Sequence, residues 1–233
     1  MSAFEVKSFI KDSLVDWPGK VSAVVFLGGC NFRCPYCYNA DLVLRPESLP
    51  NVELDQIADY LVSNPLLDGV VVSGGEPTIH PDLPELIRWL GSFKLAVKLD
   101  TNGSNPEMLR LLLEENLLDY VAMDLKAPLD GESYRRATGA DCVEKVRESA
   151  EILMSSSIPY EFRTTLVPGL LGPEDVVRMV KQVKGARKYA LQQFKPAQEL
   201  VGTLKNTDPY PPELLQRLAR RIRRYVGEVE VRL

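Results

Sequence analysis

The stretch Val21-Ser-Ala-Val-Val-Phe-Leu-Gly-Gly-Cys-Asn-Phe-Arg-Cys-Pro-Tyr-Cys-Tyr-Asn39 joins an apolar run to a loop that holds three of the chain's four cysteines. The run from Val21 to Leu27 is rich in β-branched residues, which predicts a buried strand. The cysteines that follow it, Cys30, Cys34 and Cys37, have the spacing C-x3-C-x2-C. Two questions follow from this stretch: which fold contains the strand, and which kind of site the three cysteines form.

The cysteine loop allows two kinds of site. Cys34 and Cys37 alone have the C-x-x-C form of a thiol redox site, and C-P-Y-C is the version found in glutaredoxins. With Cys30 included, the three thiolates are soft ligands suited to an iron–sulfur cluster or to zinc. Structural zinc takes four protein ligands, and only the distant Cys142 and His80 are left for the fourth position. Three cysteines on a [4Fe–4S] cluster leave one iron open to a substrate or cofactor.

Five further apolar runs follow the first, and amphipathic helical patterns separate them. The runs are almost continuously apolar, which is typical of strands covered on both faces in a parallel sheet. They span residues 69–72, 95–99, 120–123, 160–166 and 189–191. Six strands alternating with helices predict an α/β fold, namely an open partial (β/α)6 TIM barrel with a mostly parallel six-stranded sheet. In such a barrel the active site lies at the C-terminal ends of the strands.

We expect a single domain over residues 1–233, because a chain of 233 residues is long enough for one large core. Residues 1 to about 20 form an N-terminal extension of this domain. Residues from about 211 to 233 are expected to form a helix with an apolar face and then an edge strand, because residues 228–233 alternate between polar and apolar.

Composition and charge exclude several functions. The net charge of −4 gives no general attraction to nucleic acid or to an anionic membrane. No apolar run approaches the roughly 20 residues of a membrane helix, and the N-terminus lacks the apolar segment of a signal peptide. We therefore expect a cytoplasmic protein with no nucleic-acid partner and no membrane partner. In a reducing compartment, clustered cysteines are typical of metal binding or catalysis.

Polar residues and glycines follow the predicted strands, so a barrel would gather them at one rim. Gly74 and Gly75 let a backbone approach closely, and Glu76 can accept hydrogen bonds from an ammonium group. Asp100 can bind ribose hydroxyls, and Phe194 can pack on a nucleobase. An amino acid joined to a nucleoside offers all of these groups, and S-adenosylmethionine (SAM) is such a molecule.

Two motifs in this order resemble those of the radical SAM superfamily. The first is the cysteine motif from Cys30 to Cys37, with the aromatic Tyr36 directly before its last cysteine, and the second is Gly74-Gly-Glu-Pro77. Three later stretches are similar to the activating enzymes of glycyl radical enzymes: Asp100-Thr-Asn-Gly103, Met123-Asp-Leu-Lys126 and Arg163-Thr-Thr-Leu-Val-Pro-Gly169.

Two other stretches narrow the resemblance. Asp12-Ser-Leu-Val-Asp-Trp-Pro-Gly-Lys20 and Leu191-Gln-Gln-Phe-Lys-Pro196 are most similar to anaerobic ribonucleoside-triphosphate reductase activating proteins, with pyruvate formate-lyase activating enzymes close behind. The resemblance runs from about Lys7 to Pro196, which is most of the chain. One position departs from it, because relatives commonly have C-H-N where this chain has Cys37-Tyr-Asn39.

The resemblance implies a role for each motif. Cys30, Cys34 and Cys37 would ligate three irons of a [4Fe–4S] cluster, and the fourth iron would chelate the amine and carboxylate of SAM. Reductive cleavage of SAM would give methionine and a 5′-deoxyadenosyl radical, which removes a hydrogen from the Cα of a glycine in a partner enzyme. The residues expected to bind SAM are Tyr36, Gly74, Gly75, Glu76, Asp100, Asn102, Lys126, Arg163, Gln193 and Phe194.

The implied partner is a glycyl radical enzyme, specifically an anaerobic ribonucleotide reductase. The implied electron source is an external one-electron donor such as flavodoxin or ferredoxin. Two alternatives stay open. A radical SAM enzyme similar to 7-carboxy-7-deazaguanine synthase would act on a small molecule. An iron–sulfur protein or a glutaredoxin-like dithiol protein would carry electrons without cleaving SAM.

Overall fold

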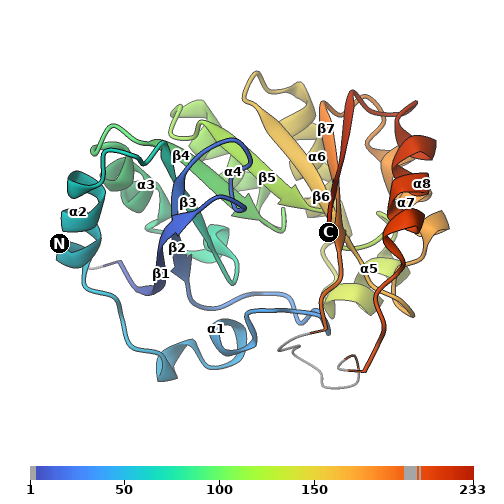
Figure 1. Ribbon diagram of the computed structural model, residues 1–233, viewed down its shortest axis with the longest axis horizontal. Coiled ribbons are helices and arrows are strands. Elements are labelled where there is room, and N and C mark those ends of the chain that lie inside the picture. The colour runs from blue at the N-terminus through green and yellow to red at the C-terminus, as the bar shows by residue number, and fades with distance from the viewer. Residues whose placement is uncertain (1–3, 197–203, 205) are drawn as a thin grey trace. The chain divides into compact units, whose positions relative to one another are not determined.

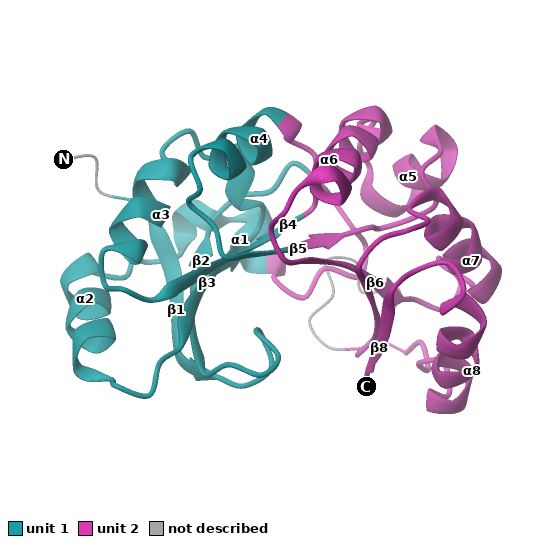
Figure 2. Cartoon of the chain, turned by 90° about the horizontal axis from the view of Figure 1, so that it is seen from above, with its two compact units in different colours: residues 1–31, 41–101, 107–121 teal, residues 32–40, 102–106, 122–233 magenta. Residues whose placement is uncertain are grey.

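The computed structural model describes residues 4–196, 204 and 206–233 of the chain (Figure 1). The chain divides into two compact units, which Figure 2 distinguishes by colour. Unit 1 consists of residues 1–31, 41–101 and 107–121, and unit 2 of residues 32–40, 102–106 and 122–233. The single domain expected from the sequence stays a prediction.

The sheet has eight strands, and not the six that the apolar runs predict. Their order in the sheet is the same as their order in the sequence. The strands are β1 (Val6–Ser13), β2 (Ser22–Leu27), β3 (Gly69–Gly74), β4 (Ala96–Thr101), β5 (Tyr120–Asp124), β6 (Tyr160–Leu166), β7 (Lys188–Gln193) and β8 (Glu228–Arg232). Strands β2, β3 and β4 pair in parallel, as do β6, β7 and β8. The α/β class and the mostly parallel sheet are therefore confirmed, and the partial barrel stays a prediction.

The two additional strands lie at the ends of the strand order. Strand β8 is the edge strand that the alternation of residues 228–233 predicts. Strand β1 lies in the expected N-terminal extension and pairs antiparallel with β2. Its register shifts between Val6 and Ser8 and again between Ile10 and Ser13. Because such irregularities interrupt the alternation of side chains between the two faces, the sequence of β1 shows no clear strand period.

The helices of unit 1 bury the apolar stripes that their sequences predict. Leu83, Leu86, Ile87 and Leu90 are all buried, at the spacing of one helical face. The helical elements that lie wholly or mostly in this unit are α1 (Ala40–Leu44), η1 (Pro46–Ser48), α2 (Leu54–Ser63), η2 (Pro77–Ile79), α3 (Leu83–Gly91) and α4 (Pro106–Glu114).

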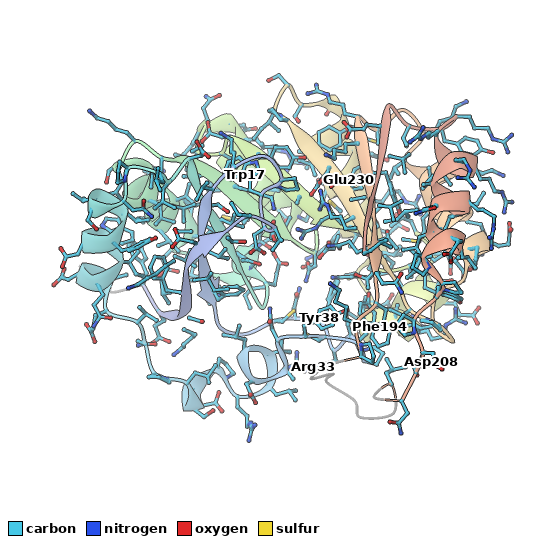
Figure 3. The ribbon with its side chains drawn as sticks, in the orientation of Figure 1. Trp17, Arg33, Tyr38, Phe194, Asp208 and Glu230 are labelled. Carbon is cyan, nitrogen blue, oxygen red and sulfur yellow. The ribbon has the colours of Figure 1, made fainter. Side chains whose placement is uncertain are left out.

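Trp17 has a packing role in unit 1. It is buried in a cluster with Val24 of β2 and Val71 of β3, and Figure 3 shows its position beside these strands. Gly69 makes room for the ring, because a Cβ at that position would lie 2.7 Å from Cζ3 of Trp17. The segment before β2 therefore closes over one face of the strands.

In unit 2, two helices lie beside the strands. Helices α7 (Pro173–Gln182) and α8 (Pro212–Ile222) lie on the same side of β6 and β8 (Figure 2). Helix α8 buries Leu215, Leu218 and Ile222, as its sequence predicts, and it ends at Ile222. The helices of this unit are α5 (Gly131–Thr138), α6 (Val143–Ser155), α7 (Pro173–Gln182) and α8 (Pro212–Ile222).

Within the residues described, no helix has both the length and the apolar character needed to span a membrane.

Candidate active site

The predicted site residues are divided between the two units. Cys30, Gly74, Gly75, Glu76 and Asp100 belong to unit 1. Unit 2 contains the other members of the set, namely Cys34, Tyr36, Cys37, Asn102, Lys126, Arg163, Gln193 and Phe194.

The cysteines lie in an irregular loop that follows β2. Cys34 is buried, whereas Cys30 and Cys37 are half-buried. The backbone N–H of Cys37 donates to the carbonyl of Cys34 at 3.1 Å, so these two residues share one turn. All four cysteines of the chain lie among the described residues, and all are thiols rather than disulfides. Three soft donors at this spacing fit the ligand set of an iron–sulfur cluster.

Among the residues described, no three side chains of His, Cys, Asp or Glu form a group that could hold a metal ion. Cys30, Cys34 and Cys37 therefore stay predicted cluster ligands.

Gly74 and Gly75 bring two backbone segments together within unit 1. The N–H of Gly75 donates to the carbonyl of Leu27 at 2.9 Å, and the N–H of Glu76 donates to the carbonyl of Gly29 at 2.8 Å. A Cβ on Gly74 would overlap Leu27, and a Cβ on Gly75 would overlap the carbonyl of Gly29. These glycines therefore allow their backbone to approach the segment that leads into the cysteine loop. Their contact with SAM stays a prediction.

The Glu76 carboxylate is buried and its orientation is fixed by hydroxyl donors. Its Oε1 accepts hydrogen bonds from Thr78 Oγ1 at 2.5 Å and from Thr101 Oγ1 at 2.6 Å. The backbone N–H of Thr78 donates to the same oxygen at 3.1 Å. Neither threonine was predicted as a site residue. The signal for Thr78 is its place two residues after Glu76, where a side chain can bond to the local backbone.

Asp100, the predicted ribose ligand, is held by a fully buried lysine. Lys98 Nζ lies 2.8 Å from Asp100 Oδ1 and donates to the backbone carbonyl of Asp16 at 2.5 Å. Ser73 Oγ approaches Asp100 Oδ2 at 3.5 Å. Lys98 was not predicted as a site residue. The available signal was a charged residue between Val97 and Leu99 in an otherwise apolar strand, because lysine is rarely buried without a partner.

Asn102 shapes the turn that follows β4. Its Oδ1 accepts from the backbone N–H of Ser104 at 2.9 Å, which makes an Asx turn. Gly103 has a positive φ of 73° in this turn, and a Cβ there would overlap the side chain of Met123. This contact lies within unit 2. The structure therefore gives Asn102 a structural role, and its predicted contact with SAM is not tested.

Asp124 is a site residue that sequence analysis did not single out, and it holds both predicted cations of unit 2. Lys126 Nζ donates to Asp124 Oδ2 at 2.9 Å, and Arg163 Nε donates to Asp124 Oδ1 at 2.8 Å. Burial disfavours the charged carboxylate, but Arg163 and Lys126 outweigh it and hold the pKa of Asp124 well below its ordinary value. Burial likewise opposes the charge on Lys126, yet Asp124 raises the pKa of Lys126 well above its usual range.

Helix α5 contacts the cysteine loop at Phe32 and Arg33. The ring of Phe32 packs edge-on against Tyr134, with centroids 6.2 Å apart, and the N–H of Arg33 donates to the carbonyl of Thr138 at 2.7 Å. Tyr134 Oη also accepts from the N–H of Lys126, at 3.4 Å. Tyr36 of the loop is buried, and desolvation, followed by the nearby Cys34, raises its pKa well above the ordinary tyrosine value. Tyr36 is therefore an uncharged phenol.

The end of β7 contacts both the cysteine loop and a segment close to α8. The N–H of Lys195 donates to Tyr38 Oη at 2.7 Å, so the tyrosine that departs from the common C-H-N pattern ties the loop to this strand end (Figure 3). Gln193 Nε2 donates to the carbonyl of Tyr210 at 2.8 Å, while its Oε1 is buried and accepts no hydrogen bond from the described residues. Phe194 is 0% exposed, so its ring presents no open face to a nucleobase in this structure.

Comparison with known proteins identifies the class of this protein. A model of the radical SAM superfamily matches residues 24–183, which is more than half of the chain. The chain therefore belongs to the radical SAM superfamily of enzymes. This membership implies a [4Fe–4S] cluster and SAM as cofactors, and it favours the cluster interpretation of the cysteine loop over the dithiol interpretation.

Two relatives differ in how much of their length this chain spans. MJ1227 of Methanocaldococcus jannaschii, provisionally named a glycyl-radical enzyme activating enzyme, is 34% identical over 97% of this chain and 95% of its own. The probable GTP 3′,8-cyclase of Thermococcus kodakarensis is 30% identical over 60% of this chain and 46% of its own. The chain thus spans nearly all of MJ1227 but only about half of the cyclase.

Solved structures show the same fold. SuiB of Streptococcus suis bound to S-adenosylmethionine has a TM-score of 0.64 and 16% identity, over 89% of this chain and 51% of SuiB. TYW1 with a lysine-pyruvate adduct has a TM-score of 0.62 and 17% identity, over 88% of this chain and 74% of TYW1. At these identities the likeness establishes the fold alone.

Proposed function

We propose that this protein is an activating enzyme that installs a glycyl radical on an anaerobic ribonucleotide reductase. The observation that supports an activating function is the match with MJ1227, because it extends over almost the whole of both chains. The choice of a reductase as partner rests on the stretches at residues 12–20 and 191–196, which resemble the activating proteins of these reductases.

In this proposal the thiolates of Cys30, Cys34 and Cys37 would hold a [4Fe–4S] cluster, and three cysteine ligands would leave the cluster open to SAM. A bound cluster would supply the one-electron reduction of SAM on which removal of hydrogen from the partner's glycine depends. The remaining residues of the chain bind and orient SAM and exclude water, as is usual where a cofactor carries the difficult chemistry.

The carboxylates of unit 1 are suited to two groups of SAM. The three donors on Oε1 fix the orientation of Glu76, so its carboxylate can accept from the ammonium group without reorganising. The ion pair with Lys98 would orient Asp100 for the ribose hydroxyls. Gly74 and Gly75 contribute by keeping the Glu76 segment close to the backbone that precedes Cys30.

The residues of unit 2 supply cations and amide groups. Lys126 and Arg163, both held by Asp124, would bind the SAM carboxylate or orient the substrate. Gln193 has a buried carbonyl oxygen that accepts nothing from the described residues, which suits it to a donor on SAM. Tyr36 and Asn102 complete the proposed binding set together with Phe194, whose buried ring would have to be uncovered before it could pack on the adenine.

The proposal also extends to the cellular setting. The protein would act in the cytoplasm as one radical SAM domain, and an external donor such as flavodoxin or ferredoxin would reduce it. Its partner would be the glycyl radical enzyme, with no nucleic acid and no membrane involved. The second candidate is a small-molecule radical SAM enzyme, which the similarity to GTP 3′,8-cyclases favours.

The first experiment tests cleavage of SAM. The protein is reconstituted with iron and sulfide without oxygen, reduced, and given SAM, and 5′-deoxyadenosine is quantified by chromatography. We expect product from the wild type and from Cys142→Ala, a matched control outside the motif, and none from Cys30→Ala, Cys34→Ala or Cys37→Ala. Full activity in Cys30→Ala would overturn the cluster assignment, and a loaded cluster without product would favour an electron carrier.

The second experiment tests the partner. The loaded protein, SAM and a reductant are mixed with the anaerobic ribonucleotide reductase of the same organism, and the reductase is examined by electron paramagnetic resonance. We expect the doublet signal of a glycyl radical. If 5′-deoxyadenosine forms but no doublet appears, the assigned partner is wrong and the small-molecule alternative gains support.

A further inference from the structure

Three consecutive carbonyl groups directly precede Cys30, and all three accept hydrogen bonds from one segment. The N–H of Gly75 donates to Leu27 and the N–H of Glu76 donates to Gly29, as described above. The carbonyl of Gly28, between them, lies 2.8 Å from Nε2 of His80. All of these residues belong to unit 1. Residues 75–80 therefore hold the backbone that leads into the first predicted cluster ligand.

Two of these three donors are backbone N–H groups, and the third is the side chain of His80. It is half-buried at the end of η2, and its own N–H donates to the carbonyl of Pro77 at 3.1 Å, which anchors its backbone. A carbonyl oxygen has no proton to give, so His80 Nε2 must be the donor to Gly28. The contact therefore specifies which ring nitrogen carries the proton.

The other contacts of Gly28 and Gly29 leave this backbone little freedom. A Cβ on Gly28 would lie 2.6 Å from Cβ of Pro46. The N–H of Gly29 donates to the carbonyl of Leu42 at 2.7 Å, and Gly29 has a positive φ of 80°. The direction in which Cys30 presents its thiol follows from the backbone at these residues. A donor on the Gly28 carbonyl thus acts on the cysteine two residues later.

We propose that His80 is a positioning residue for the cluster, because its hydrogen bond to Gly28 holds the backbone that presents Cys30 to iron. The inference rests on the proposed ligation by the three cysteines and deepens it. His80 itself touches neither iron nor SAM in this role. It acts as outer-shell partners of metal ligands do, by limiting how the ligand can move.

The test compares two substitutions at this position. His80→Leu removes the donor at similar volume, at a residue that lines a cavity of about 290 Å³. His80→Gln keeps an N–H donor at a similar reach. After anaerobic reconstitution, the rate of iron release to a ferrous chelator is measured. We expect His80→Leu to lose iron about tenfold faster than the wild type, and His80→Gln to stay within about twofold of it.

A matched control separates positioning from loss of stability. Asn64 is also half-buried in unit 1, where its Nδ2 donates to Tyr60 Oη at 2.6 Å and to Asp12 Oδ1 at 3.1 Å. Asn64→Leu removes a donor of the same kind away from the cysteine loop. We expect it to lower the melting temperature without speeding iron release. Equal rates of iron release in Asn64→Leu and His80→Leu would overturn the positioning role.

A second measurement needs no cluster. His80 is the only histidine of the chain, so a protein without an affinity tag, labelled with 15N-histidine, gives the signals of one ring. We expect NMR of the apoprotein to show the proton on Nε2, and a proton on Nδ1 alone would contradict the hydrogen bond. If the wild type assembles no cluster, the proposed function fails together with this role. If the wild type loads normally and His80→Leu retains iron equally long, only the role of His80 fails.

Discussion

The carboxylate of Asp124 forms ion pairs with two cations of the same unit. Arg163 and Lys126 overcome the effect of burial and lower the pKa of Asp124. Because the folded-state pKa lies below the unfolded value of about 4, the ion pairs stabilise the fold above that pH. Their contribution is lost as the pH falls from the unfolded value toward the folded one, where the folded state also takes up the proton.

We predict that Asp124→Asn lowers the free energy of unfolding by about 3 kcal/mol at pH 7, because it leaves two largely buried cations without a counter-charge. The difference in free energy of unfolding between the variant and the wild type shrinks at pH 3, because the wild type has by then lost part of the stabilisation that its ion pairs provide. Urea denaturation of the apoprotein at both pH values measures this. The control is Asp141→Asn, which breaks an exposed pair with Arg135 and should cost less than about 1 kcal/mol. An equal deficit for Asp124→Asn at both pH values would contradict the assignment.

Lys126 and Arg163 were predictable from their motifs, but their shared partner was not. Asp124 and Lys126 are two residues apart at the end of a strand, a spacing that suggests a pair. Arg163 is on another strand, and the sequence pattern contains no information on which strands meet at which register. The partner of Lys98 poses the same difficulty, because it is a backbone carbonyl at Asp16 in the segment before β2.

Strand β8 is an edge element, and its Arg232 pairs with a buried glutamate of β6. Arg232 Nη1 and Nη2 donate to the two oxygens of Glu161 at 2.9 and 2.6 Å, which is the bidentate geometry of a strong pair. Glu161 lies on β6 and is 0% exposed, whereas the residues of β8 are half-buried or exposed. Loss of Arg232 would remove the bidentate partner of this buried carboxylate.

We predict that Arg232→Leu lowers the free energy of unfolding by about 3–5 kcal/mol, and that the double variant Glu161→Leu/Arg232→Leu recovers most of this loss. Chemical denaturation measures both, and hydrogen exchange at β8 should accelerate in the single variant. Arg221→Leu is the matched control, because it breaks an exposed pair with Glu174 and should cost less than about 1 kcal/mol. A double variant no more stable than Arg232→Leu would rule out this explanation.

Elements with a regular pattern were predictable, and irregular ones were not. The apolar spacing from Leu83 to Leu90 predicted a helix that the structure contains as α3. Strand β1 was missed because its two register shifts remove the alternation on which a strand prediction depends. Helix α5 was not predicted either, since its residues are mostly polar and it buries only Tyr134 and Ala137 among its large or apolar side chains. It nevertheless contacts the cysteine loop.

For the whole molecule, the sequence predicts the cofactor chemistry better than the partner. Cluster binding and SAM binding need cysteines and glycines at fixed short spacings, which a motif preserves. Recognition of a protein partner depends on a surface built from residues far apart in the sequence. The superfamily was therefore predictable and is confirmed by the family match. The reductase partner rests on similarity to particular stretches and has to be tested with the partner itself.

Cluster binding should stabilise the whole fold, because a ligand that prefers the folded chain raises its free energy of unfolding. At a hundredfold excess over the dissociation constant the gain is about 2.7 kcal/mol, which corresponds to roughly 5–10 °C in melting temperature for a chain of this size. The three cysteines lie within eight residues, so an unfolded chain that still binds iron would reduce the shift.

We predict that anaerobic calorimetry shows a higher melting temperature for the loaded protein than for the chelator-treated one. The variant that lacks Cys30, Cys34 and Cys37 should melt at one temperature under both conditions. A shift that persists in this variant would mean that iron stabilises the chain at some other place.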